Sequence, residues 1–421
     1  MTIPARTYAL IRRASTHHLI EKLLDGRVAR AGLSVESLNL GGQQILRFIG
    51  EFWTSKQRQA SSLHEISYRA CFKPQLPRFF IDRLTQPGDV VYDPFMGRGT
   101  TPIEAALLGR NVIGNDANPL SRTFTRPRLH PPSSEDIARR IDGIKLDKNT
   151  SSSLDLSMFY HPRTEAESLS LRRYLAKRAA SRGEDDLDRW IRMVATSRLT
   201  GHSNGFFSVY TLPPNQAMSA ENQRKINRSR KQKPEYRDVK ELVLRKTKSL
   251  LRNITDEEKA ALARVGGRAL FVTADAGRTR SIADNSVQLT VTSPPFLDTV
   301  NYAQDNWLRS WFNSIAWEEV ARRLTVVRSI EVWKHTMARV FQELYRVTSP
   351  DGVVAFEVGE IRKRNLKLDE VVVPIGIQAG FRCAGVLVNQ QKFTKTSNIW
   401  GIKNNRAGTN TNRIVVFHKS H

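Results

Sequence analysis

Residues 89–101 read Asp89-Val90-Val91-Tyr92-Asp93-Pro94-Phe95-Met96-Gly97-Arg98-Gly99-Thr100-Thr101. The stretch begins as a short apolar run that ends in an acid, continues as a glycine-rich turn, and then opens a helix-like segment, residues 100–108. A second apolar run follows at residues 111–116 and also ends in an acid, Asp116. The order strand, turn, helix and strand is typical of a βαβ unit in a parallel sheet.

The same pattern resumes later in the chain, after a long interruption. Further buried strands are predicted at five apolar runs, residues 269–275, 287–292, 353–358, 383–388 and 413–417. A helix is predicted at residues 332–345, because apolar side chains recur there at helical spacing. These runs predict an α/β fold, a Rossmann-like sheet with helices on both faces.

The predicted sheet domain consists of residues 71–120 and 265–421. Residues 1–70 are expected to form an N-terminal helical region, in which residues 45–53 form a helix with one buried face. Residues 121–264 are expected to form a mainly helical, basic insertion between the two parts of the sheet domain.

The charge of the chain predicts its partner. There are 66 Lys and Arg against 41 Asp and Glu among 421 residues, a formal net charge of +25. Within residues 221–250 alone, 11 Lys or Arg face 4 Asp or Glu. A positive surplus of this size indicates a polyanionic partner, and nucleic acid is the first candidate.

The composition also excludes several classes of protein. Two cysteines, Cys71 and Cys383, are too few for a disulfide scaffold or a cysteine-rich zinc module, so no metal site is expected. No segment approaches the ~18 consecutive apolar residues of a membrane span, so no membrane partner is expected. We expect a cytoplasmic protein that associates with the nucleoid.

The glycine-rich turn is a candidate cofactor site. Gly97 and Gly99 let the backbone turn tightly and approach a ligand closely. The helix that begins near Thr100 offers free N–H groups at its first turn. Pro102 stands where a dinucleotide fingerprint has its third glycine, which argues against a nicotinamide oxidoreductase.

Two acids at neighbouring strand ends extend this candidate site. An acid in the position of Asp116 accepts hydrogen bonds from the ribose hydroxyls of a nucleoside cofactor. Asp275, which ends a third strand, is placed to accept the amine of an adenine. Either acid alone is as common in a helix cap or loop, so the prediction rests on their occurrence at successive strand ends.

A second motif, Thr292-Ser293-Pro294-Pro295-Phe296, closes the fourth predicted strand. The two prolines stiffen the backbone, and the Ser293 hydroxyl and Pro294 carbonyl provide acceptors beside the flat face of Phe296. Such a site suits a planar base with an amino group, held by two hydrogen bonds and ring stacking. In isolation, a Ser-Pro-Pro sequence is usually only a stiff turn.

Together the motifs resemble those of bacterial S-adenosylmethionine-dependent DNA amino-methyltransferases. The family's FxGxG motif matches residues 95–99, its (S/D/N)PP(Y/F) motif matches residues 293–296, and residues 72–76 resemble its KPxxL element. The resemblance covers roughly residues 70–120 and 265–421. It implies a class I methyltransferase sheet, S-adenosylmethionine as cofactor and double-stranded DNA as substrate.

The resemblance also implies roles for individual residues. The catalytic residues would be Ser293, Pro294, Pro295 and Phe296. The cofactor-binding residues would be Lys73, Pro74, Asp93, Phe95, Gly97, Gly99, Thr100, Asp116 and Asp275. Because the serine-first motif is more typical of the cytosine-N4 branch, the expected product is N4-methylcytosine from a flipped cytosine. Adenine N6 is the first alternative.

The basic insertion is expected to bind the DNA. Phosphate contacts are predicted from Arg224, Lys225, Arg228, Arg230 and Lys231, and base contacts from Asn215 and Gln216. The insertion lies between the second and third sheet strands, where the family pattern has no recognition domain, so its role is inferred from charge and size. A cognate restriction endonuclease is a further expected partner. An RNA base methyltransferase and a catalytically silent nucleic-acid-binding protein remain as alternatives.

Overall fold

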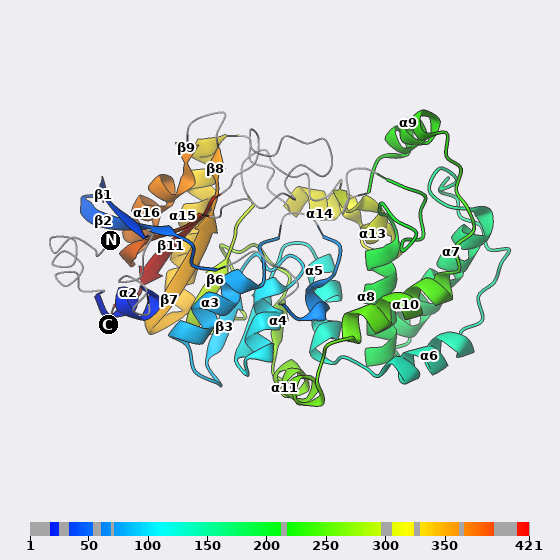
Figure 1. Ribbon diagram of the computed structural model, residues 1–421, viewed down its shortest axis with the longest axis horizontal. Helices are drawn as coiled ribbons and strands as arrows, with labels where there is room; N and C mark the ends of the chain where they lie inside the picture. Colours follow the sequence, from blue (N-terminus) through cyan, green and yellow to red (C-terminus); the bar gives the residue numbers. More distant parts are fainter. Residues whose placement is uncertain are drawn as a thin grey trace.

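The computed structural model describes residues 17–24, 33–53, 60–68, 71–211, 217–295, 305–323, 329–361, 366–390 and 411–420. A nine-stranded sheet lies at one end of the molecule and a group of helices at the other (Figure 1). The predictions for Asn215, Gln216 and Phe296 fall outside the described residues.

Seven strands of the sheet come from the two segments predicted to form it. They are β3 (Val90–Asp93), β4 (Asn111–Asn115), β5 (Leu270–Val272), β6 (Val287–Thr292), β7 (Thr348–Val358), β10 (Arg382–Gln390) and β11 (Thr411–His418). The sheet order is β1-β2-β10-β11-β7-β6-β3-β4-β5. The strands from β5 to β7 run parallel, and β11 is antiparallel to both of its neighbours.

This order creates a switch point between β3 and β6. From β3 the chain proceeds outward to β4 and β5, and then returns to β6 on the opposite side of β3. In open α/β sheets, ligands bind in the crevice at the carboxyl ends of the strands where the order reverses. The topology therefore directs attention to the ends of β3 and β6.

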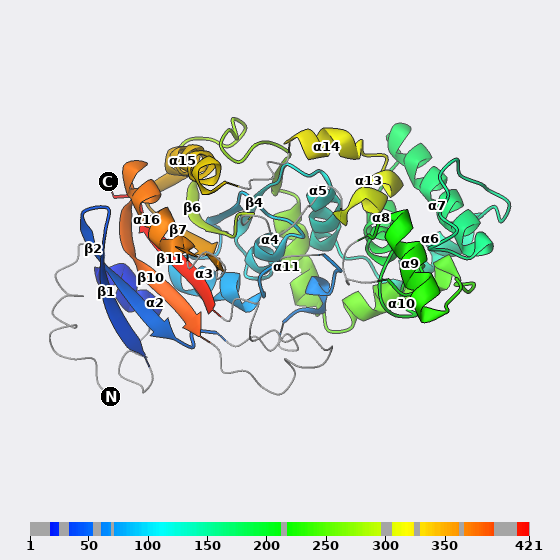
Figure 2. The ribbon, with the colours of Figure 1, turned by 90° about the horizontal axis from the view of Figure 1, so that it is seen from above.

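Helices cover both faces of the sheet (Figure 2). On one face lie α3 (Gln75–Leu84), α4 (Thr100–Leu107) and α11 (Asp256–Gly266), and on the other α15 (Ile330–Val347) and α16 (Leu368–Gln378). Successive strand residues alternate between the two cores: Val91 packs with the first set and Tyr92 with the second. The predicted α/β fold with helices on both faces is confirmed.

The predicted helical N-terminal region is wrong for residues 34–50. β1 (Ser34–Leu40) and β2 (Gln43–Gly50) form an antiparallel hairpin around Gly41-Gly42, whose φ angles are 60° and 74°. β2 then pairs in parallel with β10. Because β2 is covered on both faces, its apolar residues do not alternate, and a short apolar run of this kind also fits a helix. Helical structure in this region is restricted to α2 (His17–Leu24) and η3 (Ser62–His64) among the described residues.

Between β4 and β5 the described chain is entirely helical apart from its loops. It forms α5 (Leu120–Thr125), η4 (Arg126–Leu129), α6 (Ser134–Gly143), α7 (Pro162–Ala180), α8 (Asp186–Arg198), α9 (Ala220–Arg230), α10 (Val239–Leu251) and α11. α11 packs against α4 and so joins the sheet domain. Two helices, α13 (Trp307–Phe312) and α14 (Trp317–Arg323), connect β6 to α15, and β8 (Glu360–Ile361) pairs with β9 (Leu366–Lys367). Of the described helices, none is both long and apolar enough to cross a membrane.

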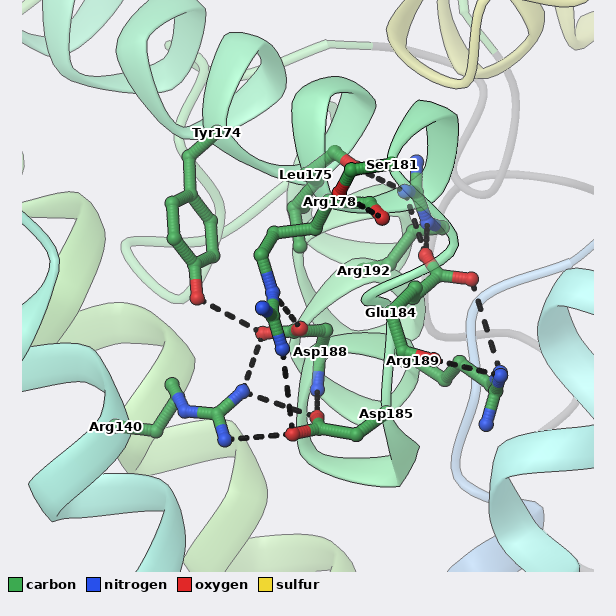
Figure 3. Close-up of polar contacts among 10 residues, drawn as sticks. All are labelled: Arg140, Tyr174, Leu175, Arg178, Ser181, Glu184, Asp185, Asp188, Arg189 and Arg192. Atoms are coloured by element: carbon green, nitrogen blue, oxygen red, sulfur yellow. Dashed lines mark hydrogen bonds and ion pairs between the residues drawn. The ribbon is translucent and has the colours of Figure 1, made fainter.

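A network of ion pairs joins α6, α7 and α8 (Figure 3). The fully buried Asp188 carboxylate accepts hydrogen bonds from Arg140 (2.6 Å), Arg178 (2.7 Å) and the Tyr174 hydroxyl (3.0 Å). Asp185 caps α8 and pairs with Arg140 at 2.7 Å. Removing one partner would leave an uncompensated buried charge. These arginines therefore hold the insertion together and are not available to a nucleic acid.

Candidate active site

A cavity lies at the carboxyl ends of β3, β4, β5 and β6, at the switch point of the sheet. Seven of the predicted site residues line it, namely Phe95, Gly97, Thr100, Asp116, Asp275, Ser293 and Pro295. The structure thus brings together the glycine-rich turn, both strand-end acids and the serine-proline motif, which are far apart in the sequence. The other predicted cofactor residues, Lys73, Pro74, Asp93 and Gly99, do not line it.

The Asp116 side chain faces the cavity and also shapes its floor. Its Oδ2 accepts the Gly97 N–H at 2.9 Å, and its Oδ1 accepts the Asn118 N–H at 2.8 Å. Burial raises the pKa of Asp116, and these two backbone donors oppose that shift. The carboxylate is therefore held in place by two N–H groups while it borders the cavity.

We expect Asp116→Ala to weaken binding of S-adenosylmethionine by about 10- to 100-fold, since charge-assisted hydrogen bonds are worth about 1.5–3 kcal/mol each. Asp116→Asn, which keeps one carbonyl oxygen, should fall between the wild type and the alanine variant. Isothermal titration calorimetry measures the two affinities. An alanine variant with wild-type affinity would remove Asp116 from the cofactor site.

Asp93, which was predicted to contact the cofactor, is buried and does not line the cavity. Its side chain is only 1% exposed. Its Oδ1 accepts the Thr292 hydroxyl at 2.6 Å and the Phe95 N–H at 3.1 Å, so it ties the end of β3 to the end of β6. Burial raises the pKa of Asp93 to about 7.

This raised pKa predicts a pH-dependent stability. The folded state binds the Asp93 proton more tightly than the unfolded state, so the associated stability is present at low pH and is lost as the pH rises through about 7. Asp93→Asn keeps an acceptor oxygen but does not titrate. The stability of the variant relative to the wild type should therefore increase between pH 5 and pH 8, as measured by urea unfolding. A constant difference would contradict the assignment.

The serine-proline motif is held from the side of α15. Ser293 and Pro295 line the cavity, whereas Pro294 is buried behind it. The Trp333 indole donates a hydrogen bond of 3.0 Å to the Pro295 carbonyl.

Asp275, at the opposite side of the cavity, is already paired with Arg339 at 2.7 Å. Its remaining oxygen accepts the Gly277 N–H at 2.8 Å.

Several lining residues were not predicted. α15 contributes Trp333, Thr336, Met337 and Val340 to the cavity wall. The sequence predicts this helix, but its apolar spacing looks the same whether it faces the core or a ligand. Asn118 also lines the cavity, and its buried Nδ2 has no hydrogen-bond partner among the described residues. A buried amide without a partner suits a site that is completed by a polar ligand.

The predicted DNA contacts lie on α9 and at its end, and they differ in availability. Arg224 pairs with Asp155 at 2.7 Å, Lys225 pairs with Glu221 at 2.6 Å, and Arg230 lies over the Tyr210 ring. Arg228 and Lys231 are exposed and form no ion pair with any residue that the structure describes. Exposed pairs are weak, so all five cations can face a polyanion.

Besides the cations of α9, the insertion has a basic hollow of about 440 Å³ where α5 meets α7 and α8. Arg122, Arg126, Arg189 and Arg192 line it together with a single acid, Glu184. Burial, followed by the charges of Arg189 and Arg122, lowers the pKa of Arg126. The positive surface of the insertion therefore extends beyond α9.

Comparisons with known proteins agree with the motifs. Residues 29–121 match the DNA methylase family. This match begins before residue 70, where the motif resemblance starts, and it includes the β1–β2 hairpin. The Type II methyltransferase M.MjaII of Methanocaldococcus jannaschii is 36% identical over 76 residues, which are 18% of this chain and 14% of that protein.

Other relatives match over similarly short segments. The Type II methyltransferase M.MvaI of Kocuria varians is 32% identical over 97 residues, or 22% of this chain and 20% of that protein. The Type II methyltransferase M1.MboII of Moraxella bovis is 40% identical over 77 residues, or 17% and 30%. The matches thus span less than a third of each of these curated relatives. The structure of the rRNA methyltransferase aviRa from Streptomyces viridochromogenes aligns over 87% of this chain and 93% of that chain, at 12% identity and a TM-score of 0.34.

Proposed function

We propose that this chain, whose residues 29–121 match the DNA methylase family, transfers a methyl group from S-adenosylmethionine to an exocyclic amino nitrogen in DNA. The observation that carries the proposal is the shared cavity: Gly97, in the glycine-rich turn, and Asp116, just after β4, border the same space as Ser293. A methyl donor and an amine acceptor must meet in one place, because an in-line displacement depends mainly on position and electrostatics.

The residues around the cavity fit S-adenosylmethionine. Asp116 would accept the ribose hydroxyls, the unpartnered Nδ2 of Asn118 would donate to the nucleoside part, and the apolar face of α15 would cover it. When bound, the cofactor supplies an electrophilic methyl group on a sulfonium. Ser293 would accept a hydrogen bond from the amine and thereby direct the nitrogen lone pair toward the methyl.

We favour the N4 of cytosine as the acceptor, with the N6 of adenine as the alternative, since the motif begins with serine. The target amine is hidden in a duplex, so the base must be extruded into the cavity. Residues 121–264 would hold the flanking DNA through Arg228, Lys231 and the other cations of α9. A restriction endonuclease of the same specificity and a cytoplasmic, nucleoid-associated location follow as parts of this proposal.

Mass spectrometry of nucleosides tests the function directly. DNA from a host that expresses the chain is compared with DNA from the same host that expresses Ser293→Ala. We expect N4-methylcytosine only with the wild type. N6-methyladenine instead would establish the alternative acceptor, and the absence of both products from DNA, with a methylated base in RNA, would overturn the DNA assignment.

A further inference from the structure

A buried glutamate stands beside the serine of the catalytic motif. Thr292, the last residue of β6, pairs with Phe356 on β7 in a parallel register, so the residues that follow them, Ser293 and Glu357, are also neighbours. The Ser293 side chain lies within hydrogen-bonding reach of the Glu357 carboxyl, where it acts to lower the pKa of that group. Glu357 is only 6% exposed, and its Oε1 also accepts a hydrogen bond from the Asn412 amide on β11.

The chemistry of the three groups determines which of them donates. The Nδ2 of Asn412 is a donor only, so the Glu357 oxygen that it contacts is an acceptor. An ionised carboxylate has no proton to donate, so the hydrogen bond between Glu357 and Ser293 uses the serine proton. The hydroxyl proton of Ser293 is therefore directed toward Glu357, and the lone pairs of the hydroxyl oxygen remain available to a group in the cavity that Ser293 lines.

Among the described residues around Glu357, no cation pairs with its carboxylate and competes with the serine hydroxyl. Ser293 faces its carboxyl from just beyond the end of β6, Asn412 faces it from β11, and neither side chain is charged. The next residue of β11, Arg413, pairs instead with Asp369 at 3.4 Å and with Glu360 at 3.7 Å. The serine is therefore the group on which the buried carboxylate acts most directly.

We propose that Glu357 is a positioning residue that holds the Ser293 hydroxyl as an acceptor for the amine of the target base. This inference rests on the proposed function. An amine presents N–H groups, so a serine that turns its own proton into the cavity would oppose the amine with a second donor. Protonation of Glu357 would allow that reversal. Burial raises the pKa of Glu357, which brings the change closer to neutral pH.

The first test is a double-mutant cycle on the single-turnover rate of methyl transfer to DNA. Glu357→Gln is expected to reduce the rate about 10-fold or more, which corresponds to about 1.4 kcal/mol, without changing the affinity for S-adenosylmethionine. The double variant Ser293→Ala/Glu357→Gln should be no slower than Ser293→Ala alone, because Glu357 acts through the serine. Additive losses, or a wild-type rate in Glu357→Gln, would overturn the inference.

The second test is the pH profile of the same rate. The wild type should lose rate on the acid side as Glu357 becomes protonated, and Glu357→Gln should not show this acid limb. Asn412→Ala removes a hydrogen bond that favours the ionised carboxylate, so it should move the limb to higher pH. This variant keeps the inference testable if Glu357→Gln does not fold, and an unmoved limb in it would count against the inference.

A matched control separates the role of Glu357 from the loss of any buried carboxylate. Glu167 on α7 is 4% exposed and accepts the Tyr236 hydroxyl at 3.0 Å, far along the insertion from the cavity. Glu167→Gln should keep the wild-type rate and acid limb, and a shared loss would reveal a general effect on folding. Absence of methyl transfer in the wild type itself would refute the proposed function, a result distinct from all of these.

Discussion

Ser293→Ala is expected to lower the rate of methyl transfer by about 10²- to 10³-fold, the range found when one preorganised polar contact to a transition state is removed. The affinity for S-adenosylmethionine should stay within about twofold of the wild type, because the cofactor turn and Asp116 are untouched. Single-turnover kinetics on DNA measure the rate, and calorimetry measures the affinity.

The control for this variant is another buried serine. Ser349 is 9% exposed, lies near the start of β7, and its hydroxyl donates a 3.1 Å hydrogen bond to the Val287 carbonyl, away from the cavity. Ser349→Ala should keep the transfer rate even if it costs about 1 kcal/mol of stability. If Ser293→Ala loses cofactor affinity in proportion to rate, the serine belongs to cofactor binding and not to the target base.

Gly99→Ala is expected to destabilise the fold by about 2–4 kcal/mol, from a left-handed backbone and from overpacking together. Gly99 has a φ of 78° at the N-cap of α4. A Cβ there would overlap the Thr125 side chain of α5, with Cγ2 at 2.6 Å and Oγ1 closer still. Urea unfolding of the variant and the wild type measures the loss.

Two further variants divide this loss into its parts. Gly42 has a nearly equal φ of 74°, but a Cβ there would meet nothing within 4 Å. Gly42→Ala should therefore show the backbone cost alone, about 1–2 kcal/mol. Adding Thr125→Ala to Gly99→Ala should recover part of the stability by relieving the overlap. Equal losses in Gly99→Ala and Gly42→Ala would show that close packing against Thr125 is not the reason for the glycine.

The central βαβ unit could be predicted because local patterns encode it. Residues 89–93 and 111–116 are apolar runs that end in acids, and β3 and β4 occupy nearly the same ranges. The helix predicted at 332–345 corresponds to α15, because its apolar residues recur at helical spacing on the face that packs against the sheet. Burial of a strand or helix face leaves a period in the sequence, and a period can be read without knowing the partner.

The N-terminal hairpin could not be recognised from the same kind of pattern. β2 packs on both faces, with Ile45 in one core and Phe48 in the other, so it lacks the alternation of a half-buried strand. The Gly41-Gly42 pair was the signal available for a hairpin, since both residues have positive φ.

The roles of Glu357 and of the cavity-lining face of α15 could not be predicted from the sequence either. Nothing around Glu357 in the sequence distinguishes it from any strand residue, since its partners come from β6 and β11. Trp333 is separated from Pro295 by 38 positions, yet its indole holds the end of the motif.

The sequence by itself therefore shows the residue types needed for the chemistry and the strand ends at which they occur, because glycine turns, strand-end acids and prolines are recognised from their immediate neighbours in the chain. Which of them share a cavity, which are only supports beneath it, and which neighbours orient them depends on strand order and register. Strand order and register are set by packing between residues that are far apart in the sequence, and this packing determines the positions of Asp93 and Glu357.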